Sequence, residues 1–186
     1  MRNTTVTREQ QKIEALIDRI ERLNLELAEL AFDPDLNLNT KIGAMTLDRT
    51  SEIDSDQAKY LCIRISGFVE VSLREICKDY IRTHIAAGSP MEHYINHQWS
   101  ATKRGKSANR EMILSLLLEF DKNWADDFKR NKFPKNSNGH LALNTVMEQR
   151  NKIAHGEDSN ITLADLKAYF SKIVQVIEEF EKQFKP

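Results

Sequence analysis

The scarcity of helix-breaking residues is the feature that most limits how this chain can fold. Only 6 Gly and 4 Pro are spread over 186 residues. Because these two residue types interrupt helices more strongly than any others, long stretches are left to form continuous elements. No stretch shows the alternation of apolar and polar residues that is typical of a half-buried strand. The sequence therefore predicts an all-α protein.

Apolar residues at three- and four-residue steps place the helices. Residues 7–30, "TREQQKIEALIDRIERLNLELAEL", carry such a stripe, with Thr7 and Gln10 at the spacing of a capping box. The same pattern predicts four further helices, over residues 55–87, 110–131, 141–154 and 162–184. Asn109 is placed to cap the second of these four, and Thr162 with Asp165 to cap the last.

The predicted helices divide the chain into two parts. Residues 1–50 hold the N-terminal amphipathic helix and a connecting segment, because residues 32–50 show no sustained period. Residues 51–186 hold the four main helices, which we expect to pack up and down through short turns. A chain of this length builds one well-buried core, so the four helices should form one bundle to which the N-terminal helix is added.

Cysteine usage and hydropathy indicate a cytoplasmic protein. Cys62 and Cys77 fall on the same predicted helix, roughly 22 Å apart at about 1.5 Å per residue, too far for a disulfide. We interpret both as reduced thiols. The polar N-terminus lacks the apolar core of a signal peptide, and no stretch approaches 18 uncharged apolar residues, so no membrane segment is expected.

Basic residues concentrate in one segment of a nearly neutral chain. The formal net charge is −1, yet residues 99–152 contain 11 Lys and Arg against 6 Asp and Glu. Such a segment is typical either of a surface that binds phosphate or of a solvated charged face. The candidates for contacts with an RNA backbone are Lys103, Arg104, Lys106, Arg110 and Lys152. Trp99 lies close to these residues in the sequence and could stack on an RNA base. Lys129, Arg130, Lys132 and Lys135 form a second, weaker candidate group.

The segment "RNKIAHG", residues 150–156, places an arginine, an asparagine and a histidine at the end of a predicted helix. Asn151 and His155 are four residues apart and therefore share a helix face. Arg150 is one step aside, with a side chain long enough to reach the same place. Gly156 can adopt the left-handed conformation that ends a helix, which puts His155 in the last turn.

These three side chains suit the cleavage of a phosphodiester. The guanidinium of Arg150 can bind two phosphate oxygens and keeps its charge, so it can stabilise a pentacoordinate transition state. The imidazole of His155 can take a proton from a ribose 2′-hydroxyl or give one to the leaving 5′-oxygen. Asn151 can hold either partner in place. Because no paired carboxylates with metal-ligand spacing accompany them, we expect metal-independent cleavage through a 2′,3′-cyclic phosphate.

Ordinary structural roles are alternatives for the same residues. Cationic groups in the last turn of a helix are favoured by its dipole, and "HG" is a common helix ending. His93 and His97 could share a helix face and bind a metal ion, but no third ligand stands at a recognisable spacing, so no metal site is predicted. We interpret His140, next to Gly139, as a solvated loop residue. Trp124 and Phe128 are at core spacing.

At Arg150 to His155 the chain resembles the HEPN superfamily, small helical bundles marked by Arg, four to six residues, then His. With "GFVEVSLREI" in an earlier long helix, it looks most like the RiboL-PSP-HEPN branch. The resemblance covers residues 51–184 and implies an HEPN-like bundle acting as an endoribonuclease on RNA, in a homodimer whose two motifs form one composite active site. It implies catalytic roles for Arg150 and His155 and a supporting role for Asn151.

The resemblance leaves further roles open. Glu70, in "GFVE", is a candidate for orienting Arg150 or His155, and equally for a solvated or helix-pairing acid. Many family members act in toxin–antitoxin, antiphage or stress-linked systems, so an antitoxin or regulatory protein is a possible partner, while other members have lost activity. The alternative function is an inactive helical interaction or nucleotide-binding module, for which the leucine-rich N-terminal helix could pair with another chain. No cofactor is expected.

Overall fold

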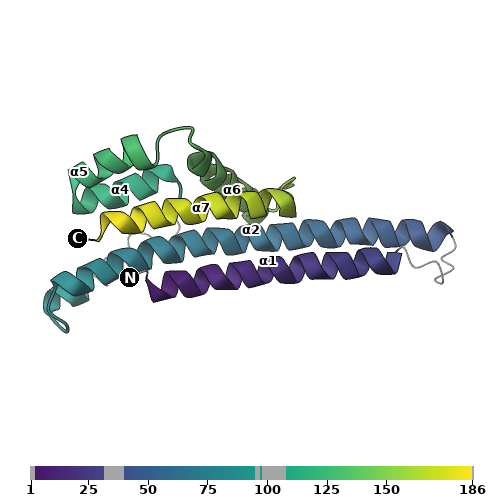
Figure 1. The fold of residues 1–186 in the computed structure, drawn as a ribbon, viewed down its shortest axis with the longest axis horizontal. Helices are drawn as coiled ribbons and strands as arrows, with labels where there is room; N and C mark the ends of the chain where they lie inside the picture. The colour runs from purple at the N-terminus through teal and green to yellow at the C-terminus, as the bar shows by residue number, and fades with distance from the viewer. Residues whose placement is uncertain (1–2, 32–39, 95–96, 98–107, 186) are drawn as a thin grey trace.

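The computed structural model describes residues 3–31, 40–94, 97 and 108–185, with backbone alone for residues 30–31 and 40–50. Throughout this described part the regular elements are helices, which confirms the all-α prediction (Figure 1). They include α1 (Thr4–Ala31), α2 (Thr40–His84), α4 (Arg110–Phe120), α5 (Lys122–Asp127), the π-helix η1 (Phe128–Lys132), α6 (Asn138–Ala154) and α7 (Leu163–Gln183), and residues 90–94 are helical as well.

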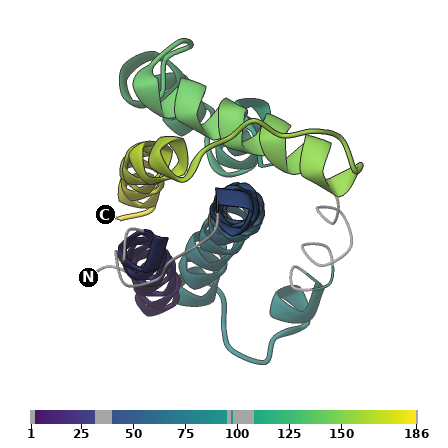
Figure 2. The same cartoon turned by 90° about the vertical axis from the view of Figure 1, so that its right-hand side faces the viewer.

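The long helix α2 runs through the middle of the bundle. It contacts α1, α6 and α7, and it presents a buried apolar stripe to them that includes Leu61, Ile65, Val69 and Leu73. Seen end-on, α1, α2 and α7 run alongside one another while α6 lies across α2 and α7 (Figure 2). Because α2 touches each of these three helices, it fixes the position of α6, which carries the "RNKIAHG" segment.

The start of α2 differs from the sequence prediction. Residues 32–39 lie outside the described part, but residues 40–50, predicted as a connection, are helical. The prediction is wrong there because the stretch lacks an apolar period but also lacks proline, and its one glycine, Gly43, weakens a helix that packing has established further along without ending it. The predicted boundary at residue 50 falls inside α2.

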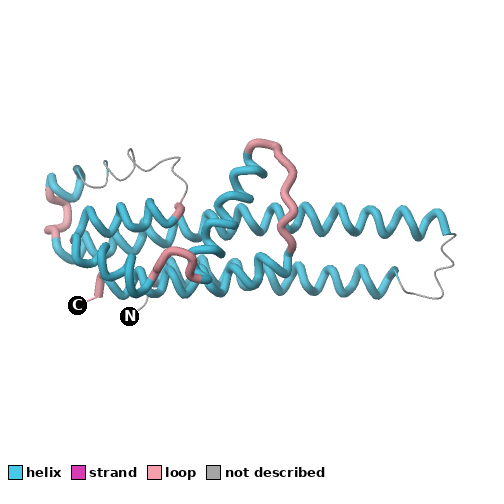
Figure 3. The backbone as a smooth tube through the Cα atoms, turned by 90° about the horizontal axis from the view of Figure 1, so that it is seen from above, coloured by secondary structure: helices cyan, strands magenta, loops and turns pink. Residues whose placement is uncertain are grey.

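The N-terminal helix α1 is part of the core. Its buried residues Val6, Ile13, Ile17 and Ile20 belong to the same cluster as the apolar residues of α2 and α7. This part of the apolar stripe is therefore not free to pair with another chain, a role that the alternative function suggested for the helix, whereas Leu23 and Leu25 are 39% and 66% exposed. Beyond α6 and α7 the α1–α2 pair extends alone (Figures 1 and 3).

Helix α1 also begins earlier than predicted. Its cap is Asn3, whose Oδ1 accepts a hydrogen bond from the Val6 N–H at 3.0 Å. Thr7 lies inside the helix and donates its hydroxyl to the Asn3 carbonyl, so the predicted capping box at Thr7 and Gln10 is wrong. An asparagine at the N-cap satisfies a free N–H as well as a threonine does, and tertiary contacts decide between the two.

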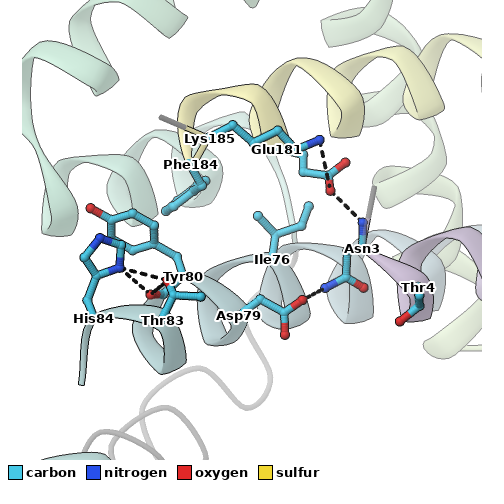
Figure 4. Close-up of a pocket in the computed structure, with 10 residues that line it drawn as sticks. All are labelled: Asn3, Thr4, Ile76, Asp79, Tyr80, Thr83, His84, Glu181, Phe184 and Lys185. Carbon is cyan, nitrogen blue, oxygen red and sulfur yellow. Dashed lines mark hydrogen bonds and ion pairs between the residues drawn. The ribbon is translucent and has the colours of Figure 1, made fainter. Parts of the chain in front are cut away.

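The N-terminus of α1 is joined to the C-terminal ends of α2 and α7 (Figure 4). The Asn3 backbone N–H donates to Glu181 Oε1 at 2.7 Å, and the Asn3 side-chain amide donates to Asp79. These groups line a pocket of about 630 Å³ whose apolar wall includes Tyr80 and Phe184. The acidic side chains that line this pocket, Asp79 and Glu181, already accept hydrogen bonds from Asn3. We therefore interpret the pocket as the place where three helix ends pack together.

The predicted helix over residues 110–131 is divided at Asp121. The extended backbone of Asp121 ends α4, and its carboxylate accepts the N–H groups of Asn123 and Trp124 to start α5. An aspartate favours this role over the helix interior because its side chain competes for backbone N–H groups. The apolar stripe continues across the break, since Phe128 is buried and Trp124 packs against the core, as predicted.

Local features of the sequence set where α4 and α7 begin and how closely α6 packs on α7. Thr162 and Asp165 form a capping box at the start of α7, and Asn109 caps α4, both as predicted. Gly139 allows α6 to approach α7, because a Cβ atom there would lie 2.5 Å from Val176 Cγ2. Residues 155–162 return across the long helices to α7 (Figure 3).

Cys62 and Cys77 both lie on α2, are buried and form no disulfide, as expected. No helix within the described residues is long and apolar enough to span a membrane.

Candidate active site

The end of α6 is built by a helix-terminating motif. Gly156 has a φ of +72°, which confirms the predicted left-handed residue. Its N–H donates to the Ile153 carbonyl at 3.2 Å, and the Glu157 N–H donates to the Lys152 carbonyl at 2.9 Å. This pair of bonds is the Schellman arrangement. His155, the last residue before Gly156, is thereby fixed at the tip of the helix.

Arg150 is held from two sides. Its Nη1 donates to Asn151 Oδ1 at 3.2 Å, and its Nη2 lies 3.9 Å from Glu70 Oε1 on α2. The side chains of Arg150 and Glu70 are 36% and 42% exposed, so the ion pair faces solvent. The structure thus brings Glu70, predicted as an orienting residue, beside Arg150. An exposed pair of this kind contributes little to stability, so its main effect is on the direction of the guanidinium.

His155 is exposed, and no hydrogen bond or ion pair is formed by its ring within the described residues. Its backbone N–H donates to the carbonyls of Asn151 and Lys152, which fixes the backbone but leaves the imidazole free. Asn151 lies one turn earlier, about 40° away around the helix axis. A free imidazole near Asn151 and Arg150 can exchange protons with a molecule bound from solvent.

Beneath this surface α2 supports α6 with one side chain per turn. Cys62 Sγ donates to the Val146 carbonyl at 3.5 Å, and Ser66 Oγ donates to Met147 Sδ at 3.6 Å. Glu70 is the next residue in this series.

Burial raises the pKa of Cys62 to about 11, an effect that the nearby Arg150 partly opposes. Cys62 therefore stays a neutral thiol that packs.

The basic residues predicted to bind RNA are not placed together. Lys152 is exposed in the last turn of α6. Lys103, Arg104, Lys106 and Trp99 lie outside the described residues.

Arg110 is buried, with an exposed fraction of 6%. Its Nε donates to the Phe133 carbonyl at 3.1 Å and its Nη2 to the Lys129 carbonyl at 3.4 Å. The prediction that it contacts RNA is therefore wrong, because these carbonyls at the end of η1 lack helical partners and occupy the guanidinium instead.

His140 differs from its prediction as a solvated loop residue. It lies in the first turn of α6, is 6% exposed and accepts the Asn136 N–H through Nδ1 at 3.0 Å. Burial lowers the pKa of His140, and the positive charge of Arg110 lowers it further. A neutral ring fits the accepted hydrogen bond, so this histidine is a structural residue.

One contact near the candidate site was missed by sequence reasoning. Ser159, in the loop after α6, donates its hydroxyl to Gln149 Oε1 at 2.9 Å. Gln149 directly precedes Arg150, so this bond ties the loop to the helix beside the guanidinium. The sequence could not predict this bond, because the partner of a surface glutamine depends on how the loop folds back. Its one hint is that Gln149 adjoins the motif. No group of three or more His, Cys, Asp or Glu side chains with metal-site geometry is present in the described part.

Comparison with known proteins gives one family. Residues 13–186 match the family described as RiboL-PSP-HEPN. The match includes most of α1, in keeping with the burial of this helix in the common core. No curated protein and no solved structure matches the chain.

Proposed function

The chain belongs to the RiboL-PSP-HEPN family, and from this premise we propose that it is an endoribonuclease that cleaves single-stranded RNA without a metal ion. The observation that carries the proposal is the arrangement at the end of α6. The side chain of Arg150 is half-exposed and oriented by Glu70 and Asn151, and the ring of His155 is open to solvent. A charged guanidinium and a free imidazole on one helix end can supply the charge stabilisation and the proton transfer that cleavage at a ribose 2′-hydroxyl needs.

In the proposed reaction the substrate's own 2′-oxygen attacks the adjacent phosphorus. The bond between O2′ and phosphorus forms, the bond between phosphorus and O5′ breaks, and the products are a 2′,3′-cyclic phosphate and a 5′-hydroxyl. Arg150 binds the non-bridging oxygens and stabilises the charge of the pentacoordinate transition state. His155 moves a proton, either from the 2′-hydroxyl or to the leaving O5′. Asn151 positions Arg150.

One chain supplies a single His155, whereas the reaction needs one proton removed and one delivered. We therefore propose a homodimer in which a second copy brings its own motif to the same phosphate. The exposed apolar side chains of α2 support a dimer that forms beside the candidate site. Ile63 lies seven residues before Glu70 on the same face of the helix and is 46% exposed, and nearby Tyr60 is 52% exposed. In the cell we propose a cytoplasmic toxin or defence effector restrained by an antitoxin or regulatory protein.

The test is to incubate the purified protein with labelled single-stranded RNAs of varied sequence in excess chelator. We expect shortened products that end in a 2′,3′-cyclic phosphate, identified by mass spectrometry. If every RNA stays intact across a broad substrate set, the proposal fails. RNA that is bound but never cut would instead support the interaction module.

A further inference from the structure

A second pocket lies where the loop after α6 crosses the α1–α2 pair. Its volume is about 480 Å³, within the range of small-molecule sites. Asn24 of α1 and Asp54 and Ser55 of α2 line it together with Ser159 and the first residues of α7. None of the side chains that line it is a lysine, arginine or histidine.

Two of the residues that line this pocket each have an acceptor atom that lacks a donor. Asn24 Oδ1 and Asp54 Oδ1 are both shielded from solvent and have no hydrogen-bond partner. A buried acceptor without a donor destabilises the folded protein. The terminal torsions of Asn and Asp are soft, so a small rotation turns either oxygen toward the pocket. A ligand that donates hydrogen bonds there would satisfy both atoms.

The start of α7 adds donors to the same pocket. Leu163 and Ala164 are the first two residues of this helix, and their backbone N–H groups have no acceptor within it. The Thr162 side chain caps Asp165 and leaves these two N–H groups for another acceptor. Because Asp54 is negative and no basic side chain lines the pocket, a phosphate is disfavoured. The pocket therefore suits a neutral ligand that carries donors beside an acceptor.

Among the four RNA bases, guanine alone has two adjacent donors, N1–H and N2–H, beside an acceptor, O6. A carboxylate can accept the two donors in parallel. We propose that this pocket binds a guanine base, with Asp54 accepting from N1–H and N2–H, Asn24 accepting the second N2–H, and the first N–H groups of α7 donating to O6. The identification of its source as the substrate RNA rests on the proposed function.

The pocket adjoins the candidate active site through the loop. Ser159 lines the pocket and donates to Gln149, the residue before Arg150. Ser159 is four residues after His155, so their Cα atoms are at most about 14 Å apart. An RNA strand whose phosphate lies at Arg150 can place a base near by in the pocket. Guanine would then be read on a nucleotide flanking the cleaved bond.

The binding test uses RNA that the proposed reaction cannot cut. Fluorescent 2′-O-methyl hexauridylates, with one central base replaced by guanine, hypoxanthine, adenine or cytosine, are titrated with the full-length protein and its Asp54→Asn and Asp56→Asn variants. Asp56 is the matched control, because it is two residues away on α2, 79% exposed and paired with Lys59. Circular dichroism confirms that all three proteins fold equally. We expect the guanine probe to bind about tenfold more tightly than the hypoxanthine probe, which lacks the N2 amine, and Asp54→Asn alone to remove the difference.

A parallel cleavage assay separates this inference from the proposed function. Guanine-selective binding that depends on Asp54, in a protein that cuts no RNA, supports the pocket and defeats the nuclease. Cleavage with no dependence on flanking guanine, together with equal binding of all probes, supports the nuclease and overturns the pocket. Equal effects of Asp54→Asn and Asp56→Asn on guanine binding would also overturn it.

Discussion

Glu70 of α2 and Arg150 of α6 face each other across the bundle, with Oε1 and Nη2 3.9 Å apart. They are 80 positions apart in the sequence, so only the packing of α6 on α2 brings them together. The pair leaves the guanidinium accessible to a phosphate while limiting the directions it can take.

Arg150→Lys should reduce RNA cleavage by about 10²-fold, because an ammonium keeps the charge but loses the fork that binds two phosphate oxygens. Glu70→Gln should reduce it by roughly tenfold or less, since it removes only the orienting partner. Cleavage rates under single-turnover conditions measure both, with Arg74→Lys, an exposed arginine on α2, as the control. Full activity of Arg150→Lys would show that the fork is not used.

His155→Ala should lower the cleavage rate by about 10²- to 10⁴-fold, the usual effect of removing a proton-transfer group. Because the His155 side chain is exposed and without partners in the described part, circular dichroism and the melting temperature should not change. His93→Ala, which removes another exposed histidine, is the control. A rate equal to that of the unaltered protein would exclude His155 from the chemistry.

Ile13→Ala should lower the free energy of unfolding by about 2 to 5 kcal/mol, because it leaves a cavity in the core that α1 shares with α2 and α7. Leu25→Ala, at a position that is 66% exposed, should change it by about 0.5 kcal/mol or less. Urea denaturation measures both values. If Ile13→Ala lowered the free energy of unfolding as little as Leu25→Ala does, α1 would not be part of the core.

His140 should make stability depend on pH. Burial lowers the pKa of His140 below its usual 6.5, so as the pH falls through 6.5 the unfolded chain binds a proton that the folded protein does not. The free energy of unfolding should therefore decrease as the pH falls from about 7. His140→Gln should reduce this slope, measured by denaturation at several pH values, while His84→Gln at an exposed site should keep it.

Cys62 should resist alkylation in the folded protein. Burial raises its pKa from 9.0 to about 11, so the thiolate is scarce at pH 8 and the sulfur is inaccessible. Between pH 9 and 11 the unfolded chain loses a proton that the folded protein keeps, so stability should fall as the pH rises through this window. Mass spectrometry after iodoacetamide treatment tests the first point. Rapid labelling of Cys62 without denaturant would contradict it.

Local sequence signals predicted those features whose causes are local. The capping box at Thr162 and Asp165, the cap at Asn109 and the left-handed Gly156 each depend on side chains within a few residues, and the structure has all three. The helix stripes followed from the 3.6-residue period. The all-α class followed from these stripes and from the lack of strand patterns.

Local signals failed where the environment decides. Arg110 looked like a member of a basic surface, yet its guanidinium satisfies carbonyls at the end of η1, 19 and 23 residues away. His140 looked like a loop residue beside a glycine, yet it is buried in the first turn of α6. The partners of Arg110 are not visible in the sequence because the chain returns to them only after folding, and the burial of His140 depends in the same way on the packing around it.

By itself the sequence determined the helical class, the helix ends with local caps and the presence of Arg150, Asn151 and His155 on one helix end, because these follow from spacing and from side-chain chemistry. The tertiary structure alone decided that Glu70 meets Arg150, that α1 belongs to the core, and that Asn24 and Asp54 come together beside the start of α7. The physical reason is that each of these contacts joins residues far apart in the chain, and burial of a common apolar core selects which helix faces meet.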